Sequence, residues 1–311
     1  MKNLFTLFFL FFTIGLSAQQ LPERNTFEGN GFIWNPAMTA VRNYWELGAT
    51  YKQQWMGFED APSSAFVSFQ YPFLDKNMSA GVFIIHDNTH PLKFNSINFN
   101  YNYQLPLNLF KDDRLSIGIN GSLGEYHISS DRIVVSDAAD LFLPNEEMTS
   151  MVPNASVGLF YVSEVERFYN NGFYVGLSAN QLLGRDLIFD ADGTSPLNLQ
   201  RQLHANAIVG VSFLALPDLL VEPSLWLNYS ENNVTDFNLG VLVEKENTFW
   251  AGMAFSNSQQ FSLQAGVILT DGFFKDGALR IGTLANYNMG TLGQDLGFGY
   301  EFYVAYRFIV E

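Results

Sequence analysis

The chain has 311 residues, of which 48% are hydrophobic and 15% charged, with a net charge of -15 and no cysteine. The missing thiols exclude disulfides and thiolate metal sites, and the acidity argues against nucleic acid, whose phosphates need clustered lysine and arginine. The mean hydropathy of +0.03 shows that apolar and polar residues are interleaved, which disfavours a helical membrane protein.

The first eighteen residues have the layout of a secretory signal peptide. Lys2 gives a short positive region, an apolar run covers residues 4–16, and small residues precede a cleavage position after Ala18. The run is shorter than the roughly 20 apolar residues that a membrane-spanning helix needs, so a retained anchor is the weaker alternative. We expect export and cleavage after Ala18.

After the signal peptide we expect two parts, an N-terminal periplasmic or plug segment over residues 19–43 and a single barrel domain over residues 44–311. The barrel pattern is clearest from Ile97 to Leu105, where odd positions are apolar and even positions polar. Side chains along a strand alternate between its two faces. Such a strand has one apolar and one polar face, which suits a wall between lipid and a polar interior.

This alternation recurs in fourteen segments bounded by Gly, Pro, Asn or Asp clusters. We predict an all-β fold, a transmembrane outer-membrane β-barrel of about 14 antiparallel strands. Twelve or sixteen strands also fit, but bacterial single-chain barrels have an even number. A soluble β-sandwich or propeller is the alternative. The predicted strands are 44–54, 63–72, 78–87, 94–105, 113–127, 152–162, 172–181, 201–214, 219–229, 235–245, 248–256, 259–270, 278–289 and 299–310.

An even number of strands puts both chain termini on the periplasmic side. The longest connections, 128–151 and 182–200, then face outward, and short ones such as 216–218 face the periplasm, as is usual for such barrels. Aromatic pairs near the segment ends are predicted to mark the two membrane interfaces. These pairs are Tyr71/Phe73, Phe168/Tyr169, Phe249/Trp250, Phe273/Phe274 and Phe302/Tyr303.

No set of residues indicates catalysis. The stretch 86–90 reads His-Asp-Asn-Thr-His, which a solvated strand end explains better than a metal site. Residues 190–193 begin like a calcium loop but lack its closing ligands. The glycine-rich stretch 118–124 has no phosphate-loop lysine, and small residues within a strand explain it better. We therefore predict no enzyme, no metal and no cofactor.

Two short motifs near the N-terminus resemble a known family. Residues 35–40 read Asn-Pro-Ala-Met-Thr-Ala, and residues 51–62 read Tyr-Lys-Gln-Gln-Trp-Met-Gly-Phe-Glu-Asp-Ala-Pro. They resemble the Asn-Pro-Ala-Tyr-Ala-Gly and Tyr-Arg-x-Gln-Trp-x-Gly-Phe-x-Gly-Ala-Pro boxes of the PorP/SprF family. Its members are outer-membrane proteins of the type IX secretion system of Bacteroidetes, several of them linked to gliding motility. Segments 78–87 and 173–182 extend the likeness over most of the chain.

The resemblance implies a non-enzymatic protein embedded in outer-membrane lipid that works with other type IX components. It would help a specific secreted surface protein or adhesin to leave the cell or to stay attached to it. Physically, the first motif suits a turn, because proline fixes its own φ and restricts the residue before it. The second falls on the first outward connection. The candidate partner residues are Asn35, Pro36, Ala37, Gln54, Trp55, Gly57, Phe58, Ala61 and Pro62.

Two other functions stay open. A FadL-like channel for small hydrophobic molecules also has fourteen strands and an Asn-Pro-Ala box, so residues 35–37 alone do not separate it from PorP/SprF. The second motif favours PorP/SprF, and the short segment 19–43 leaves little chain for a FadL-type hatch. A general porin needs facing rows of acidic and basic residues, and 16 Lys and Arg make a basic row hard to build.

Overall fold

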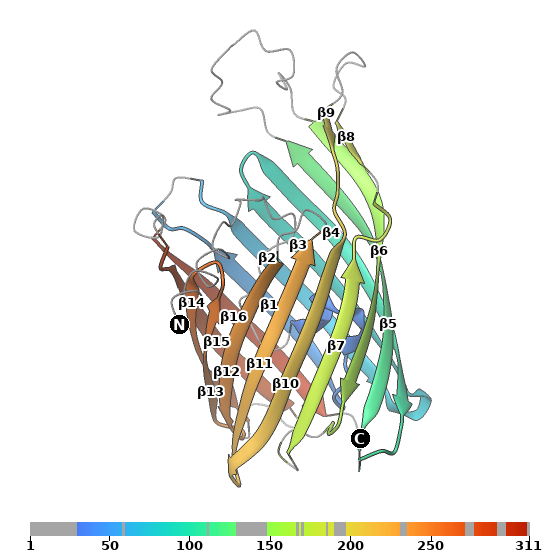
Figure 1. The fold of residues 1–311 in the computed structure, drawn as a ribbon, viewed down its shortest axis with the longest axis vertical. Helices are drawn as coiled ribbons and strands as arrows, with labels where there is room; N and C mark the ends of the chain where they lie inside the picture. The colour runs from blue at the N-terminus through green and yellow to red at the C-terminus, as the bar shows by residue number, and fades with distance from the viewer. Residues whose placement is uncertain are drawn as a thin grey trace, which may run out of the picture.

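Fourteen long antiparallel strands close into a tilted barrel (Figure 1). The computed structural model describes residues 30–57, 60–110, 112–128, 148–165, 168, 171–184, 186–189, 197–230, 235–270, 277–290 and 297–309. Each barrel strand pairs with its neighbours in the sequence, except that β7 pairs with β10 and β16 returns to pair with β1. The barrel strands are β1 (Tyr44–Gln53), β2 (Ser63–Phe73), β3 (Met78–Thr89), β4 (Leu92–Pro106), β5 (Arg114–Ile128), β6 (Met148–Val162), β7 (Gly172–Asn180), β10 (His204–Leu216), β11 (Leu219–Ser230), β12 (Thr235–Lys245), β13 (Phe249–Ser256), β14 (Gln260–Leu269), β15 (Gly277–Asn288) and β16 (Phe298–Ile309).

The predicted alternation of faces is confirmed along β4. The outer positions Ile97, Phe99, Tyr101 and Tyr103 are 39–58% exposed, whereas the inner positions Asn98, Asn100, Asn102 and Gln104 are 0–7% exposed. The outer surface of the wall is therefore apolar and its inner surface polar. All backbone groups of a closed wall find partners in neighbouring strands, which is the condition for a sheet to stand in lipid.

All fourteen predicted strands are present, with ends shifted by a few residues. β6 begins at Met148, inside the connection predicted over 128–151. Two short strands were missed, β8 (Leu187–Phe189) and β9 (Leu197–Leu199), which pair in a hairpin within the predicted connection 182–200. Three residues are too few to establish an alternating pattern. The hairpin is held instead by Leu187 and Phe189, which are buried against apolar residues of β5 and β6.

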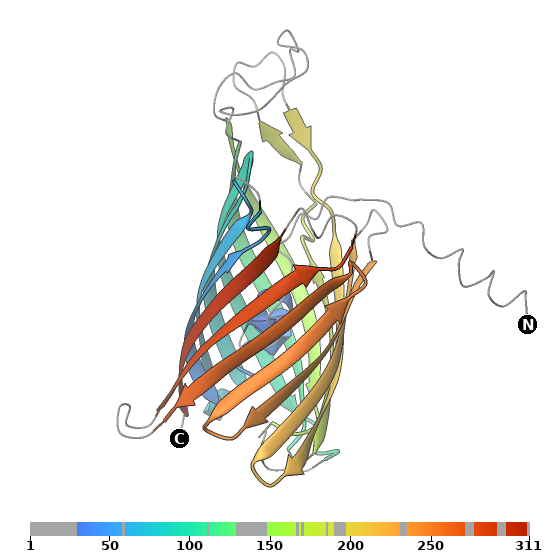
Figure 2. The ribbon, with the colours of Figure 1, turned by 90° about the vertical axis from the view of Figure 1, so that its left-hand side faces the viewer.

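The two ends of the barrel differ (Figure 2). We call the end with the connections β5–β6 and β7–β10 the loop end, and the opposite one, where β1 begins and β16 ends, the turn end. Turns at the turn end are as short as Pro217-Asp218 between β10 and β11. Which end faces the periplasm stays a prediction.

The predicted aromatic interface pairs are correct in part. Phe73, Phe249 and Phe302 lie on the outer surface, with 39–57% of each residue exposed. Trp250 and Tyr303 were wrongly predicted to lie there, because they are 3% and 4% exposed and lie in the lumen. Consecutive residues of a strand point to opposite faces, so only one member of each such pair can face outward. Tyr169, Phe273 and Phe274 lie outside the described residues.

A segment that we call the lumen segment, residues 30–43, lies inside the wall (Figure 2). It contains one turn of α-helix, α2 (Gly31–Trp34), and one of 3-10 helix, η1 (Pro36–Met38); a third short helix, η2 (Leu74–Lys76), joins β2 to β3. Among the described residues, no helix is long and apolar enough to cross a membrane. The lumen segment contributes Trp34, Ala37 and Val41 to one apolar cluster and Phe32 to another. Two of the apolar clusters inside the barrel are therefore built on this segment.

A charged side chain on the apolar outer face of β4 is expected to destabilise the barrel. Phe99 lies at the middle of the strand, and Phe99→Arg is expected to lower the free energy of unfolding from phospholipid vesicles by about 2–4 kcal/mol, the usual cost of an arginine at mid-membrane. Leu109→Arg, in the connection between β4 and β5 where Leu109 is 71% exposed, should cost less than about 1 kcal/mol. Equal losses in urea titrations would contradict a lipid-facing β4.

Candidate functional site: the lumen segment and the first loop

β4 presents a row of carboxamides to the lumen segment. Asn102 Nδ2 donates to the backbone carbonyls of Ala37 and Thr39 at 2.8 and 3.0 Å. Asn100 Nδ2 donates to the carbonyl of Phe32 at 2.9 Å. Both asparagines are buried, so these bonds replace the water that their amides lose on burial. We call Asn98, Asn100, Asn102 and Gln104 the carboxamide row.

Further donors hold the same main chain. Gln104 Nε2 donates to the carbonyl of Ala40 at 3.2 Å. On β7, Ser178 Oγ and Asn180 Nδ2 both donate to the carbonyl of Trp34, at 2.9 and 3.0 Å. The acceptors are backbone carbonyls, so this part of the wall recognises the backbone of the peptide that lies on it.

The Asn-Pro-Ala motif of the lumen segment in turn donates hydrogen bonds to the wall. Asn35 caps η1, accepting the N–H of Ala37 at 2.9 Å through its side-chain oxygen. Its amide nitrogen donates to the carbonyls of Leu159 in β6 and Leu177 in β7, at 3.1 and 3.3 Å. Pro36 begins η1, where a missing N–H costs nothing. The motif therefore fixes the turn and attaches it to two strands.

Glycines leave room for this contact. A Cβ at Gly118 of β5 would overlap the backbone of Ala37, and one at Gly158 of β6 would overlap the Asn35 amide. Gly118 belongs to the stretch 118–124, which lies within β5 as the sequence indicated. The absence of a side chain at position 118 allows two backbones to approach closely.

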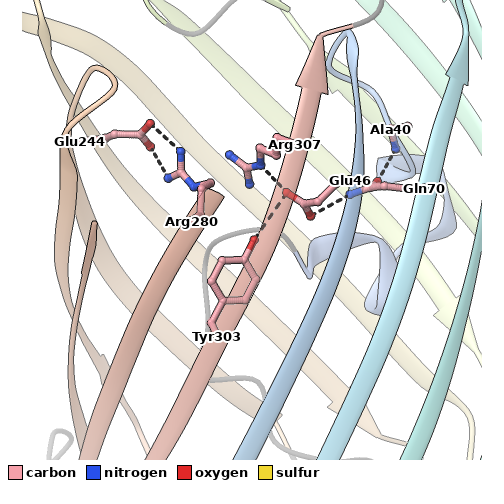
Figure 3. Close-up of polar contacts among 7 residues, drawn as sticks. All are labelled: Ala40, Glu46, Gln70, Glu244, Arg280, Tyr303 and Arg307. Atoms are coloured by element: carbon pink, nitrogen blue, oxygen red, sulfur yellow. Dashed lines mark hydrogen bonds and ion pairs between the residues drawn. The ribbon is translucent and has the colours of Figure 1, made fainter. Parts of the chain in front are cut away.

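The part of the wall formed by β16, β1 and β2 is held by charges, as Figure 3 shows. Glu46 of β1 accepts hydrogen bonds from the Arg307 guanidinium of β16 and from Gln70 Nε2 of β2, the latter at 3.2 Å. The side-chain oxygen of Gln70 accepts the N–H of Ala40 at 2.7 Å. This network connects the seam between β1 and β16 to the end of the lumen segment.

A second ion pair lies beside the first (Figure 3). Arg280 of β15 donates two hydrogen bonds of 3.0 Å to the Glu244 carboxylate of β12, and both side chains are 4% exposed. The guanidinium also lies 4.6 Å from the centre of the Trp250 ring. Because its charges are paired within the wall, this side of the barrel does not need the lumen segment as a partner.

The second motif forms the connection between β1 and β2 at the loop end. The N–H of Gln54 donates to the carbonyl of Pro62 at 2.8 Å, which closes the loop. Trp55 has a φ of 50° and is 38% exposed. Gly57 is exposed and Ala61 is half-buried, and Phe58 lies outside the described residues.

This loop is anchored to β16. The N–H of Met56 donates to the carbonyl of Phe298 at 2.9 Å. The Gly57 backbone approaches Gly297, whose φ of +74° favours glycine. Met56 itself is 60% exposed. The loop thus has a fixed base and presents two large apolar side chains, Trp55 and Met56, at the loop end.

The two motifs are not brought together. Residues 35–37 lie in the lumen against β5, β6 and β7, whereas residues 54–57 and 60–62 lie at the loop end beside β1, β2 and β16. The carboxamide row was missed as a binding surface. Its signal was available in the stretch Ile97 to Leu105, whose polar positions are all carboxamides rather than a mixture of polar residues.

Among the described residues, no three His, Asp or Glu side chains gather as metal ligands. In the stretch 86–90, His86 Nδ1 lies 2.6 Å from the side-chain oxygen of Asn95, and Asp87 accepts the Ser64 hydroxyl at 2.6 Å. These are polar contacts between neighbouring strands. The stretch 190–193 includes residues outside the described part of the chain.

A family model described as type IX secretion system membrane protein PorP/SprF matches residues 16–306. The chain belongs to this family. It is therefore a barrel of the outer membrane from a family that serves type IX secretion. No curated protein sequence matches the chain.

Several solved structures share the fold of this PorP/SprF protein. The CymD monoaromatic hydrocarbon channel has a TM-score of 0.55 at 11% identity, covering 94% of this chain and 95% of that one. The toluene transporter TbuX of Ralstonia pickettii has a TM-score of 0.55 at 12% identity, covering 90% and 93%. The toluene transporter TodX of Pseudomonas putida has a TM-score of 0.56 at 9% identity, covering 91% and 94%. At such identities the likeness concerns the fold alone.

The fit between Gly118 and the lumen segment can be tested with a single thiol, because the chain has no cysteine. Ala37 is fully buried, so a thiol introduced by Ala37→Cys should react slowly with a maleimide. Adding Gly118→Ala should raise the labelling rate roughly tenfold, because overpacking costs about 1–3 kcal/mol and 1.4 kcal/mol is a factor of ten. The control is Gly121→Ala on the same strand, whose Cβ would meet no atom within 4 Å. Equal labelling rates in the two backgrounds would contradict the fit.

The buried ion pair gives a stability prediction. Arg280→Met leaves the Glu244 carboxylate buried without its cation and should lower the free energy of unfolding in vesicles by about 3–5 kcal/mol. The double variant Arg280→Met/Glu244→Leu should regain most of that loss. Lys245→Met removes an exposed pair with Asp218, at 3.5 Å, and should cost no more than about 1 kcal/mol. Additive losses in the double variant would show that the pair does not act as a unit.

Proposed function

We propose that this protein is a non-enzymatic outer-membrane component of type IX secretion that helps one specific secreted protein to be exported or attached to the cell surface. The partner is a surface adhesin, used for gliding where the organism glides. The observation that carries the proposal is the family membership over residues 16–306. The lumen wall supports it, because the carboxamide row already binds the backbone of a peptide.

In this proposal the loop end faces outward and both termini lie in the periplasm. The signal peptide is cleaved after Ala18, and the apolar outer surface contacts outer-membrane lipid. Residues 35–37 keep the lumen segment in place, and the motif over 54–62 contacts the secreted partner or another type IX component. Trp55 and Met56 support this role, since large exposed apolar side chains on a fixed loop are typical of protein contacts.

A FadL-like channel for small hydrophobic molecules is the alternative, and the named hydrocarbon channels and toluene transporters share this fold. The lumen of this chain argues against that use. Its β4 wall carries buried carboxamides, and a hydrocarbon passing them would leave their amides without hydrogen-bond partners. The lumen segment also occupies the space between the walls.

The proposal predicts loss of one exported protein. Deleting the gene should remove one large surface protein from the cell surface and the medium, as measured by mass spectrometry, and the tagged protein should recover it or other type IX components from outer membranes. Trp55→Ala/Met56→Ala should reduce that recovery at least tenfold, because truncating a hot-spot side chain costs about 2 kcal/mol or more. Leu109→Ala, which removes an exposed apolar side chain at the turn end, serves as the control. If nothing is recovered and liposomes gain permeability to small solutes, the channel function replaces this one.

A further inference from the structure

A cavity lies on the loop-end side of the lumen segment. Its floor is formed by Ile33 and Trp34 of that segment, and its walls by the loop-end halves of β3 to β7. Four aromatic rings belong to the lining, those of Phe83, Phe94 and Tyr126 on the wall and that of Trp34 on the floor. The rings of Phe94 and Tyr126 lie 4.5 Å apart between centres. The cavity therefore offers aromatic surfaces on several sides.

The size of the cavity limits what enters it. Its volume is about 60 Å³, and one water needs about 10–15 Å³ of such space, so it has room for about four to six waters. Four to six waters take up roughly 120–180 Å³ of liquid, which matches the cavity of about 150 Å³ that holds a benzene ring in another protein. A single aromatic ring therefore fits within it.

The polar lining continues the chemistry that holds the lumen segment. Asn98, the first member of the carboxamide row, lines the cavity, and its amide donates to Ser96 rather than to the lumen segment. Asn180 also lines it while donating to the Trp34 carbonyl at 3.0 Å. The wall that binds a peptide backbone thus extends past the lumen segment into the cavity.

Gln181 is the lining residue that points to a ligand. It is 5% exposed, its side-chain oxygen has no hydrogen-bond partner, and its φ of 62° lies in the left-handed region. A buried acceptor without a partner is costly, so this oxygen favours a bound group with an N–H or O–H beside it. The charged lining residue Arg201 donates to the Pro153 carbonyl at 3.3 Å.

We propose that this cavity is a socket for one aromatic side chain on an extended segment of the secreted partner, with a backbone N–H of that segment donating to Gln181. The ring lies against the aromatic walls, and the adjoining backbone lies beside Asn98 and Asn180 of the polar lining. The segment enters from the loop end, because Trp34 and the rest of the lumen segment close the cavity on the other side. This inference rests on the proposed function, since it supplies the binding element of the partner.

The probe for the test is N-acetyl-L-phenylalaninamide, which carries one aromatic ring between two backbone amides. Saturation-transfer NMR and fluorescence titration on the full-length protein in lipid nanodiscs should show binding. N-acetyl-L-alaninamide, which lacks the ring, and toluene, which lacks the amides, should bind at least tenfold more weakly. Preferential binding of toluene would overturn the socket in favour of a hydrocarbon site, and absence of binding by all three would also overturn it.

Variants of Gln181 locate the probe. Gln181→Asn keeps a residue that tolerates a positive φ but withdraws the acceptor by one methylene, and it should weaken binding about fivefold. Gln181→Leu removes the acceptor and should do the same if it folds. The matched control is Gln264→Leu on β14, where Gln264 is 7% exposed and also has an unpartnered side-chain nitrogen. Equal affinities in Gln181→Asn and Gln264→Leu would place the probe elsewhere and overturn the proposal.

Different results would contradict the socket and the proposed function. If the secreted partner is recovered from cells equally well with Gln181→Asn and with the unchanged protein, the socket is wrong while the secretion role stands. If the probe binds as expected but no secreted protein is recovered, the socket's chemistry stands and its assignment to a secreted partner is overturned.

Discussion

A buried carboxamide without a hydrogen-bond partner costs about 1–3 kcal/mol, and β4 buries four of them in succession. Much of the interior follows from that constraint. Neighbouring strands already satisfy the backbone of the wall, so the amides of Asn100, Asn102 and Gln104 need acceptors from another part of the chain. The lumen segment supplies them as backbone carbonyls. Its helices are short and irregular, which leaves those carbonyls free to accept.

Buried polar groups find their partners in different ways on the two sides of the interior. On the β12–β16 side, the Arg280–Glu244 pair satisfies itself within the wall, and Trp250 covers the guanidinium. On the β4–β7 side, the wall depends on a peptide that lies against it. The barrel is therefore asymmetric in its capacity to bind, and the side that accepts a backbone is also the side whose glycines admit close contact. Gln70 connects the two sides, because it hydrogen-bonds both to the ion-paired Glu46 and to Ala40 of the lumen segment.

The strands of the barrel wall could be predicted from the sequence better than the contacts inside the lumen. Alternation has a period of two and needs only local residues, so all fourteen strands could be found from it. Trp250 and Tyr303 were misplaced because aromatic pairs were counted without applying that same alternation. The contacts of Asn35 could not be predicted, because they join residues more than a hundred positions apart. The residue types on the polar face of β4 held the available clue, and their uniformity was more informative than their polarity.

The lumen segment continues directly into β1, and β1 forms the seam with β16 that closes the barrel. β1 is the first strand to be synthesised, but it can complete its pairing only after β16, the last strand, has been made. Residues 30–43 are attached to β1 during that time. The segment is either in place before the two edges join or drawn in afterwards through one mouth of a finished cylinder. In the first case the lumen segment acts as a template on which the sheet curls. The hydrogen bond between Gln70 of β2 and Ala40 then positions the first strands on the segment before β16 pairs with β1. Assembly of this barrel is then a wrapping process, in which the enclosed peptide is present from the start.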